Sequence, residues 1–88
     1  MMDYEKIIHA FVDDFVENKD ALLIRKLPSA NKRDLTILIV AQNEDTARLI
    51  GRKGIIADAL REVLSVAGKR EEHRVYLKFE SFDSTSQE

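Results

Sequence analysis

Two glycines, Gly51 and Gly54, interrupt what would otherwise be one long helical pattern in the second half of the chain. Glycine weakens a helix interior and adopts positive φ without steric cost, so one helix is predicted to end here and another to begin. The residues between them, Arg52 and Lys53, are both basic and poorly suited to burial. The sequence therefore predicts a sharp helix-to-helix turn whose tip exposes two cations.

The segments before this turn show one helical and two strand-like patterns. In residues 3–18, apolar residues recur at spacings of three and four, which predicts an amphipathic helix with Asn18 as its stop. Residues 21–27 are short and apolar, and residues 35–41 are rich in β-branched residues. Both are expected to be strands, and the loop between them holds the only proline, so they could pair as a hairpin.

The later segments predict two further helices and a strand. Asn43 is expected to cap a short helix that ends near Gly51. The next helix is predicted to start at Gly54 and to end at Gly68, which has the residue type preferred at a C-cap. Residues 74–80 alternate apolar and polar side chains, which is typical of a strand with one solvent-facing side.

The predicted order of elements is α-β-β-α-α-β, which indicates an α+β fold. Two helices separate the second strand from the third, so these two strands can run parallel through a right-handed crossover. The expected architecture is a three-stranded mixed sheet with the helices packed on one face. Residues 1–80 are expected to form one domain, and residues 81–88 a flexible C-terminal tail.

Composition excludes several classes of protein. The chain contains no cysteine, which rules out disulfides and thiolate chemistry. No apolar run approaches the roughly 20 residues that span a bilayer, and no leader-like N-terminus is present, so a cytoplasmic location is expected. His9 and His73 lack triad partners and metal-ligand spacing, and Asp13 and Asp14 point about 100° apart on a helix. We therefore expect neither enzymatic activity nor a metal or other cofactor.

The net charge of −2 conceals an uneven distribution along the chain. Residues 1–20 carry two basic against six acidic side chains, whereas residues 46–70 carry six basic against two acidic ones. Ligands respond to the local field, so a mildly acidic protein can still present a phosphate site at its basic centre. Charges also cluster by chance on solvated faces, and the charge pattern alone does not separate these alternatives.

The stretch ARLIGRKGIIADALREVL, residues 47–64, resembles the RNA-binding signature of the KH domain family, in which an apolar pair, Gly-x-x-Gly and an apolar helix follow one another. The order of elements is similar to the type II KH arrangement. Within the family, length and layout resemble the small bacterial stand-alone KH proteins of the KhpA kind, with ADALR at residues 57–61 and RVYLKFE at residues 74–80. The resemblance spans nearly the whole chain and is weakest in the first helix.

The resemblance implies a role for each residue of the matching segment. The resemblance implies that a loop contacts the backbone of about four single-stranded nucleotides. The residues of this loop are Gly51, Arg52, Lys53 and Gly54. A shallow aliphatic groove for the bases would be walled, or supported from behind, by Ile50, Ala57 and Leu60. Single-stranded RNA is the partner that this arrangement implies.

Residues outside the loop complete the implied site. Arg61 matches a basic position that the family often keeps on the second helix, and Leu38 or Val40 on the neighbouring strand would add to the groove. Because the matching segment contains no aromatic residue, the bases would lie against aliphatic side chains. Tyr76 is the nearest aromatic residue, and it is expected to cover the sheet.

Two residues depart from the family pattern. Ile55 and Asp58 stand where these small bacterial proteins commonly carry basic residues, and Asp58 is expected to pair with Arg61 or Arg52. One domain alone should therefore bind weakly. The resemblance implies a homodimer, or a larger KH-containing RNA-binding protein as partner, and linking two sites in this way would raise affinity through avidity.

Three functions fit the sequence. The favoured one is single-stranded RNA binding with modest sequence preference, which for this family implies bacterial post-transcriptional regulation. A KH-shaped protein–protein interaction module without nucleic-acid binding is the first alternative, and the intact Arg52–Lys53 pair argues against it. Single-stranded DNA binding is the second alternative. It requires the same sequence features as RNA binding, because only contact with a 2′-hydroxyl separates RNA from DNA.

Overall fold

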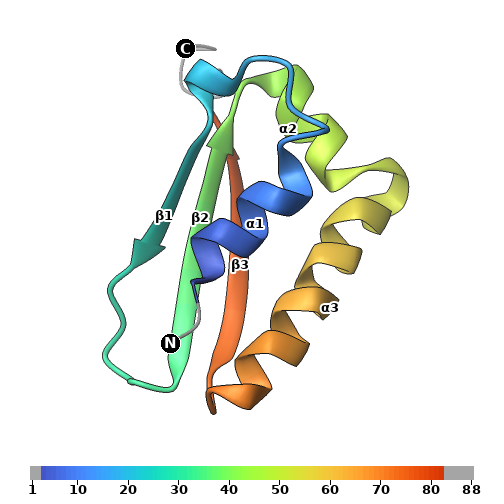
Figure 1. The fold of residues 1–88 in the computed structure, drawn as a ribbon. Coiled ribbons are helices and arrows are strands. Elements are labelled where there is room, and N and C mark those ends of the chain that lie inside the picture. The colour runs from blue at the N-terminus through green and yellow to red at the C-terminus, as the bar shows by residue number, and fades with distance from the viewer. Residues whose placement is uncertain (1–2, 83–88) are drawn as a thin grey trace.

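Three helices cover one face of a three-stranded sheet (Figure 1). The computed structural model describes residues 3–82. In chain order the elements are α1 (Tyr4–Val12), the 3-10 turn η1 (Lys19–Ala21), β1 (Leu23–Leu27), β2 (Asp34–Ala41), α2 (Asn43–Ile50), the 3-10 turn η2 (Arg52–Gly54), α3 (Ile55–Arg70) and β3 (Arg74–Ser81). This order confirms the predicted α+β architecture.

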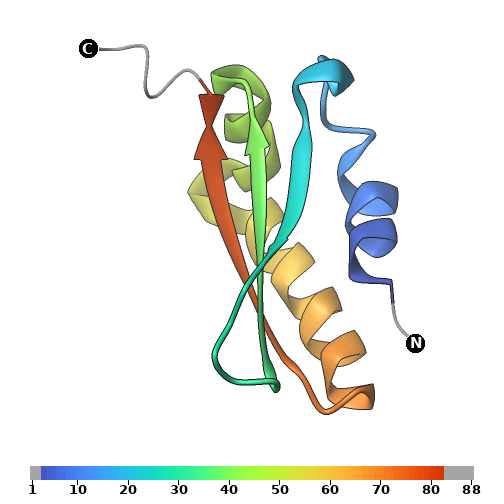
Figure 2. The same cartoon turned by 90° about the vertical axis from the view of Figure 1, so that its left-hand side faces the viewer.

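The sheet has the strand order β1-β2-β3 and is mixed (Figure 2). β1 pairs with β2 in antiparallel fashion, with Ile24 opposite Ile39, which confirms the predicted hairpin. β2 pairs with β3 in parallel, with Ile37 opposite Leu77, and the connection runs through α2 and α3. A central position explains the nearly continuous apolar sequence of β2, because this strand has a neighbour on each side and helices over one face.

The hydrophobic core lies between the sheet and the helices. Its largest fully buried side chains are Ile8, Val12, Ile37, Ile39, Leu49, Leu60 and Leu64. They come from α1, β2, α2 and α3, so the sheet and all three helices contribute. Burial of one such side chain stabilises the fold by about 1.5–3 kcal/mol, which is a large share of the stability available to a domain of this size.

The first helix is shorter than the sequence predicts. α1 ends at Val12 and does not continue to Asn18. The backbone N–H groups of Glu17 and Asn18 both donate to the carboxylate of Asp45, each at 3.0 Å. These bonds draw residues 16–18 out of a helical path and bury Val16 to 3% exposure. The tertiary contact therefore overrides the local helical periodicity.

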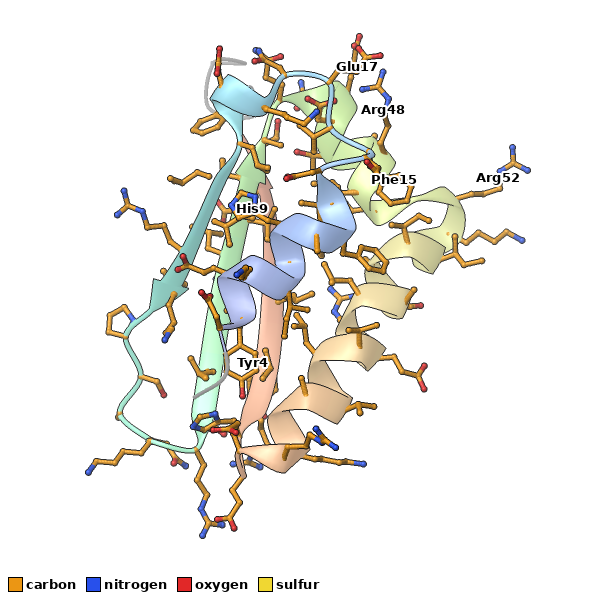
Figure 3. All side chains as sticks on the ribbon, viewed as in Figure 1. Tyr4, His9, Phe15, Glu17, Arg48 and Arg52 are labelled. Atoms are coloured by element: carbon orange, nitrogen blue, oxygen red, sulfur yellow. The ribbon has the colours of Figure 1, made fainter. Side chains whose placement is uncertain are left out.

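Asp45 is the buried charged residue that joins this segment to α2. The residue is only 2% exposed, and its carboxylate also accepts a hydrogen bond from Arg48, whose guanidinium lies 3.6 Å from Glu17 (Figure 3). The backbone hydrogen bond from Glu17 lowers the pKa of Asp45, with further lowering from Asn18 and Arg48, although burial opposes the shift. The carboxylate thus stays ionised in the folded protein.

The Asp45→Asn variant should lose about 2–3 kcal/mol of unfolding free energy at neutral pH, because an amide replaces a charged acceptor of backbone hydrogen bonds. The folded pKa of Asp45 lies below its unfolded value of about 3.9, so this stabilisation is present above that value and disappears as the pH falls through the folded pKa. Urea unfolding followed by circular dichroism should show a difference between wild type and variant that shrinks below about pH 4.

Glu17→Gln provides the control, because the Glu17 backbone N–H, not its exposed side chain, bonds to Asp45. Its unfolding free energy should stay within about 0.5 kcal/mol of wild type. An Asp45→Asn loss of equal size at pH 7 and at pH 3 would contradict the assignment to an ionised carboxylate.

Several element boundaries differ slightly from the prediction. β1 starts at Leu23, because η1 occupies the residues before it. Asn43 is the first residue of α2 rather than its cap; Gln42 holds the cap position with extended backbone and no side-chain capping bond. β3 ends at Ser81, one residue later than predicted. Of the predicted tail, residues 83–88 lie outside the described part of the chain.

Gly68 does not end α3 as predicted; it lies inside the helix. The chain turns three residues later, where the N–H of His73 donates to the Gly68 carbonyl at 2.8 Å and that of Glu72 donates to the Lys69 carbonyl at 3.2 Å. Glu72 takes the left-handed position of this turn, with φ 60°. A Cβ on Gly68 would lie 2.9 Å from the His73 carbonyl oxygen, so glycine is needed here for close approach.

The Glu72→Gly variant should raise the free energy of unfolding by about 0.5–1 kcal/mol, because glycine removes the left-handed strain at a modest cost in chain entropy. Urea unfolding can measure the gain. Glu71→Gly is the matched control, since Glu71 has a φ of −102° and gains nothing from losing its Cβ. A gain of the same size in both variants would show that removal of charge, not strain, is responsible.

Candidate nucleic-acid interface

The junction between α2 and α3 is a tight turn, as predicted. Gly51 follows α2 with φ 78°, and its N–H donates to the Ala47 carbonyl at 2.9 Å. Gly54 precedes α3 with φ 79°, and its N–H donates to the Gly51 carbonyl at 3.0 Å. Both glycines thus adopt a backbone conformation that side chains disfavour, which explains their placement three residues apart.

The two glycines differ in what surrounds them. A Cβ on Gly51 would lie 2.5 Å from Cγ1 of Ile56, so packing as well as φ requires glycine there. A Cβ on Gly54 would meet no atom within 4 Å. The surface above Gly54 is therefore open, and another molecule can approach its backbone closely.

Arg52 and Lys53 project from this turn. Both side chains are exposed, and neither forms an ion pair with any residue in the range 3–82. Figure 3 shows Arg52 pointing away from the body of the domain. Lys53 has φ 57° and ψ 22°, a left-handed conformation that costs a non-glycine residue about 1–2 kcal/mol. The turn thus holds two uncompensated cations in solvent.

The apolar residues predicted around the turn divide into two groups. Ala57 and Leu60 are 2% and 1% exposed, so they support α3 from the core side and present no surface to a ligand. Ile50, at the end of α2, is half-buried and remains accessible. Ile55, at the start of α3, is 65% exposed and lies directly beside the turn.

Arg61 lies nearly two helical turns further along α3. Its Nη1 is 3.3 Å from Oδ1 of Asp58, which confirms the expected pairing of this carboxylate. The Arg61 guanidinium carbon also lies 5.6 Å from the ring centroid of Phe79, within the range of a cation–π contact. Phe79 on β3 is therefore the aromatic residue beside the site. Sequence reasoning missed it, because only the fold shows that β3 runs beside α3.

The predicted contribution of Leu38 or Val40 to the groove is wrong. These residues alternate along β2 with Ile37 and Ile39, which are buried in the core beneath the helices. Leu38 and Val40 therefore lie on the opposite face of the sheet. Tyr76 lies on that face too and is 48% exposed, so it covers part of the sheet far from the turn between the helices.

The basic segment predicted at residues 46–70 is not one surface. Arg48 is held by Asp45 and Glu17 at the start of the site. The remaining basic residues separate along the length of α3: Arg52 and Lys53 precede the helix, Arg61 is central, and Lys69 and Arg70 occupy its last turn. The basic stretch of sequence thus forms two regions, one at each end of α3.

Neither a metal-binding cluster nor a membrane-spanning helix is found within residues 3–82. No group of three or more His, Cys, Asp and Glu side chains is placed to hold a metal ion. None of the helices in this range combines the length and the apolar character needed to cross a membrane.

Comparison with known families decides the identity of the fold. A family profile described as "KhpA/KhpB, KH domain" matches residues 5–79, which include nearly all of the sheet and the three helices and the whole turn at 51–54. The chain belongs to this KH domain family. A KH domain is a nucleic-acid-binding module and not typically an enzyme, so the expectation of an RNA-binding KH fold is confirmed at that level. Searches of curated proteins and of solved structures gave no significant match.

The two glycines of this KH domain should respond differently to alanine. Gly51→Ala should lower the free energy of unfolding by about 2–4 kcal/mol, because its Cβ meets Ile56 and its φ is left-handed. Gly54→Ala should cost only about 1 kcal/mol, because φ alone opposes it. Urea unfolding of the two variants tests this, and equal losses would contradict the difference in packing.

Proposed function

We propose that this KH domain binds single-stranded RNA by holding the nucleic-acid backbone at Gly51–Gly54 and the bases in a shallow aliphatic groove beside α3. The observation that carries the proposal is the state of the turn itself. Arg52 and Lys53 are exposed without ionic partners, and the space above Gly54 is open. A turn that served only to connect two helices would gain nothing from two exposed cations, one of which, Lys53, has a left-handed backbone.

The turn has the chemistry that a phosphate backbone requires. The N–H groups of Gly54 and Ile55 already donate to the carbonyls of Gly51 and Arg52, so the attraction to phosphate comes from the two side chains between the glycines. A guanidinium and an ammonium group can bond to phosphate oxygens from either side, and these contacts fix position without reading sequence. The missing Cβ of Gly54 lets a sugar–phosphate chain approach the protein backbone. The implied contact covers about four nucleotides.

The neighbouring side chains suit the bases of that strand. Ile50 offers an aliphatic surface at the end of α2, and the Arg61 guanidinium over Phe79 offers a planar one on which a base can stack. Ala57 and Leu60 hold α3 in place from below. Few of these groups read base edges, so the sequence preference is modest. The proposed RNA-contacting set is Ile50, Gly51, Arg52, Lys53, Gly54 and Arg61, and Ala57 and Leu60 are its buried support.

The same proposal includes a protein partner, which is either a second copy of the chain or a larger KH-containing RNA-binding protein. The support for a second copy is the exposed apolar face of α3, where Ile55, Val63 and Val66 are 65%, 42% and 60% exposed. Two weak sites joined in a dimer would bind one RNA more tightly by a factor of about 10²–10⁴ when the geometry allows both to engage. A cytoplasmic role in bacterial post-transcriptional regulation accompanies this proposal.

Replacing Arg52 and Lys53 with Asp should weaken binding of single-stranded RNA by at least about 100-fold, because attraction to phosphate becomes repulsion at both positions. Asp tolerates the left-handed backbone of residue 53, so circular dichroism and melting temperature should stay close to wild type. Fluorescence anisotropy with a labelled oligouridylate measures the loss, and the matched single-stranded DNA is titrated in parallel.

The control for this variant is Arg25→Glu/Lys26→Glu on β1, which changes the net charge equally at two exposed positions away from the turn. It should retain most of the RNA affinity. Unchanged binding in the Arg52→Asp/Lys53→Asp variant would refute the proposed site. Tighter binding of the matched DNA than of the RNA would favour the single-stranded DNA function, and no affinity for either would favour the protein-interaction module.

A further inference from the structure

A cavity lies at the end of α3 that is remote from the glycine turn. It forms where the β1–β2 loop, the last turn of α3 and the start of β3 come together at the same end of the domain (Figure 1). Its volume is about 490 Å³, within the range of about 300–1,000 Å³ that is usual for ligand pockets. The lining residues are Arg33, Lys69, Glu72, His73 and Arg74.

Backbone contacts bring these distant residues together. The N–H of Arg74 donates to the Arg33 carbonyl at 2.6 Å, so the two arginines lie beside each other where β2 and β3 begin to pair. The close approach at Gly68 turns the chain back so that His73 follows the end of α3 directly. A hydrogen bond of 2.9 Å between the buried Tyr4 hydroxyl and Nδ1 of His73 fixes the cavity wall to α1.

The charges around this cavity do not cancel. Asp34 bonds to Nε of Arg74 at 2.9 Å, and Glu72 contributes the one carboxylate of the lining. Arg33 and Lys69 form no ion pair with any other residue of the described range 3–82. Two cations from different elements therefore line one concave site without a carboxylate bound to either. An anion with several oxygen atoms would complete it.

We propose that this cavity binds a phosphate group of the RNA strand that is held at the glycine turn. This inference rests on the proposed function, because it takes the ligand to be the same RNA strand that the glycine turn holds. α3 has 16 residues and is about 24 Å long, so the turn and the cavity are two separate phosphate sites on one rigid element. The turn itself holds about four nucleotides, and a longer strand can reach the second site.

The same phosphate chemistry could come from a free mononucleotide. Amide NMR titrations of the full chain with uridine monophosphate and with inorganic phosphate test the site directly. Both probes should shift the amides of residues 33, 69 and 72–74. Arg33→Ala/Lys69→Ala should weaken this binding by about tenfold or more. Arg25→Ala/Lys26→Ala removes the same charge from β1 and should leave it unchanged.

Glu72→Gly supplies a test in the opposite direction. It removes the carboxylate from the lining and relieves the backbone strain at that position, so the fold is retained. Its affinity for uridine monophosphate should rise by a few-fold. An unchanged or weaker affinity would overturn the assignment of the cavity as an anion site.

The length of the RNA distinguishes a phosphate of the RNA strand from that of a free mononucleotide. Deca-uridylate should bind wild type at least about tenfold more tightly than tetra-uridylate, because one strand then engages both sites. Arg33→Ala/Lys69→Ala should abolish this gain and leave unchanged the binding of tetra-uridylate at the turn, which is followed through the amides of residues 51–54. Cavity shifts with uridine monophosphate but no gain from the longer strand would overturn the proposal in favour of a free mononucleotide.

The Arg52→Asp/Lys53→Asp variant separates this inference from the proposed function. In that variant tetra-uridylate should no longer shift the amides of residues 51–54, whereas uridine monophosphate should still shift the cavity amides. If tetra-uridylate still shifts the amides of residues 51–54, the proposed function fails at the turn while the cavity titration remains interpretable. If the cavity amides respond to no phosphate probe in wild type, the cavity proposal fails, whatever the turn does.

Discussion

The contact between the bare Cα of Gly51 and the side chain of Ile56 sets the direction in which α3 leaves α2. Because no Cβ separates them, the second helix starts within a few residues of the end of the first. α3 then places Leu60 and Leu64 in the core and delivers the chain to β3 in parallel with β2. The position of the exposed turn is therefore a product of core packing.

Local patterns were sufficient to predict the order of elements and most of their positions. Periods of two and of about three and a half are short-range properties, and so are the glycines that end one helix and precede the next. The end of α1 was not predictable in this way, because it depends on Asp45, which lies in another element. Gly68 was misassigned for a similar reason: its close neighbour is the carbonyl of His73, and the left-handed position is taken by Glu72.

The residues of the candidate site also divide into those that the sequence could predict and those that it could not. The turn residues and the Asp58–Arg61 pair were predictable, since they are neighbours along one stretch of chain. Phe79 was not, and Leu38 and Val40 were placed on the wrong face, because both questions require the order of strands beneath α3. The basic cavity was even less predictable from the sequence. Arg33 and Lys69 meet only after the hairpin and the parallel crossover have both formed.

The central position of β2 also protects the protein from association through its strands. The segment Leu35–Ala41 is the most apolar and β-branched part of the sheet, and segments of this kind template aggregation when an edge exposes them. The outer strands instead carry charge, with Arg25 and Lys26 on β1 and Lys78 and Glu80 on β3, all exposed. A foreign strand that approaches either side of the sheet therefore meets solvated charges before it can reach the apolar centre.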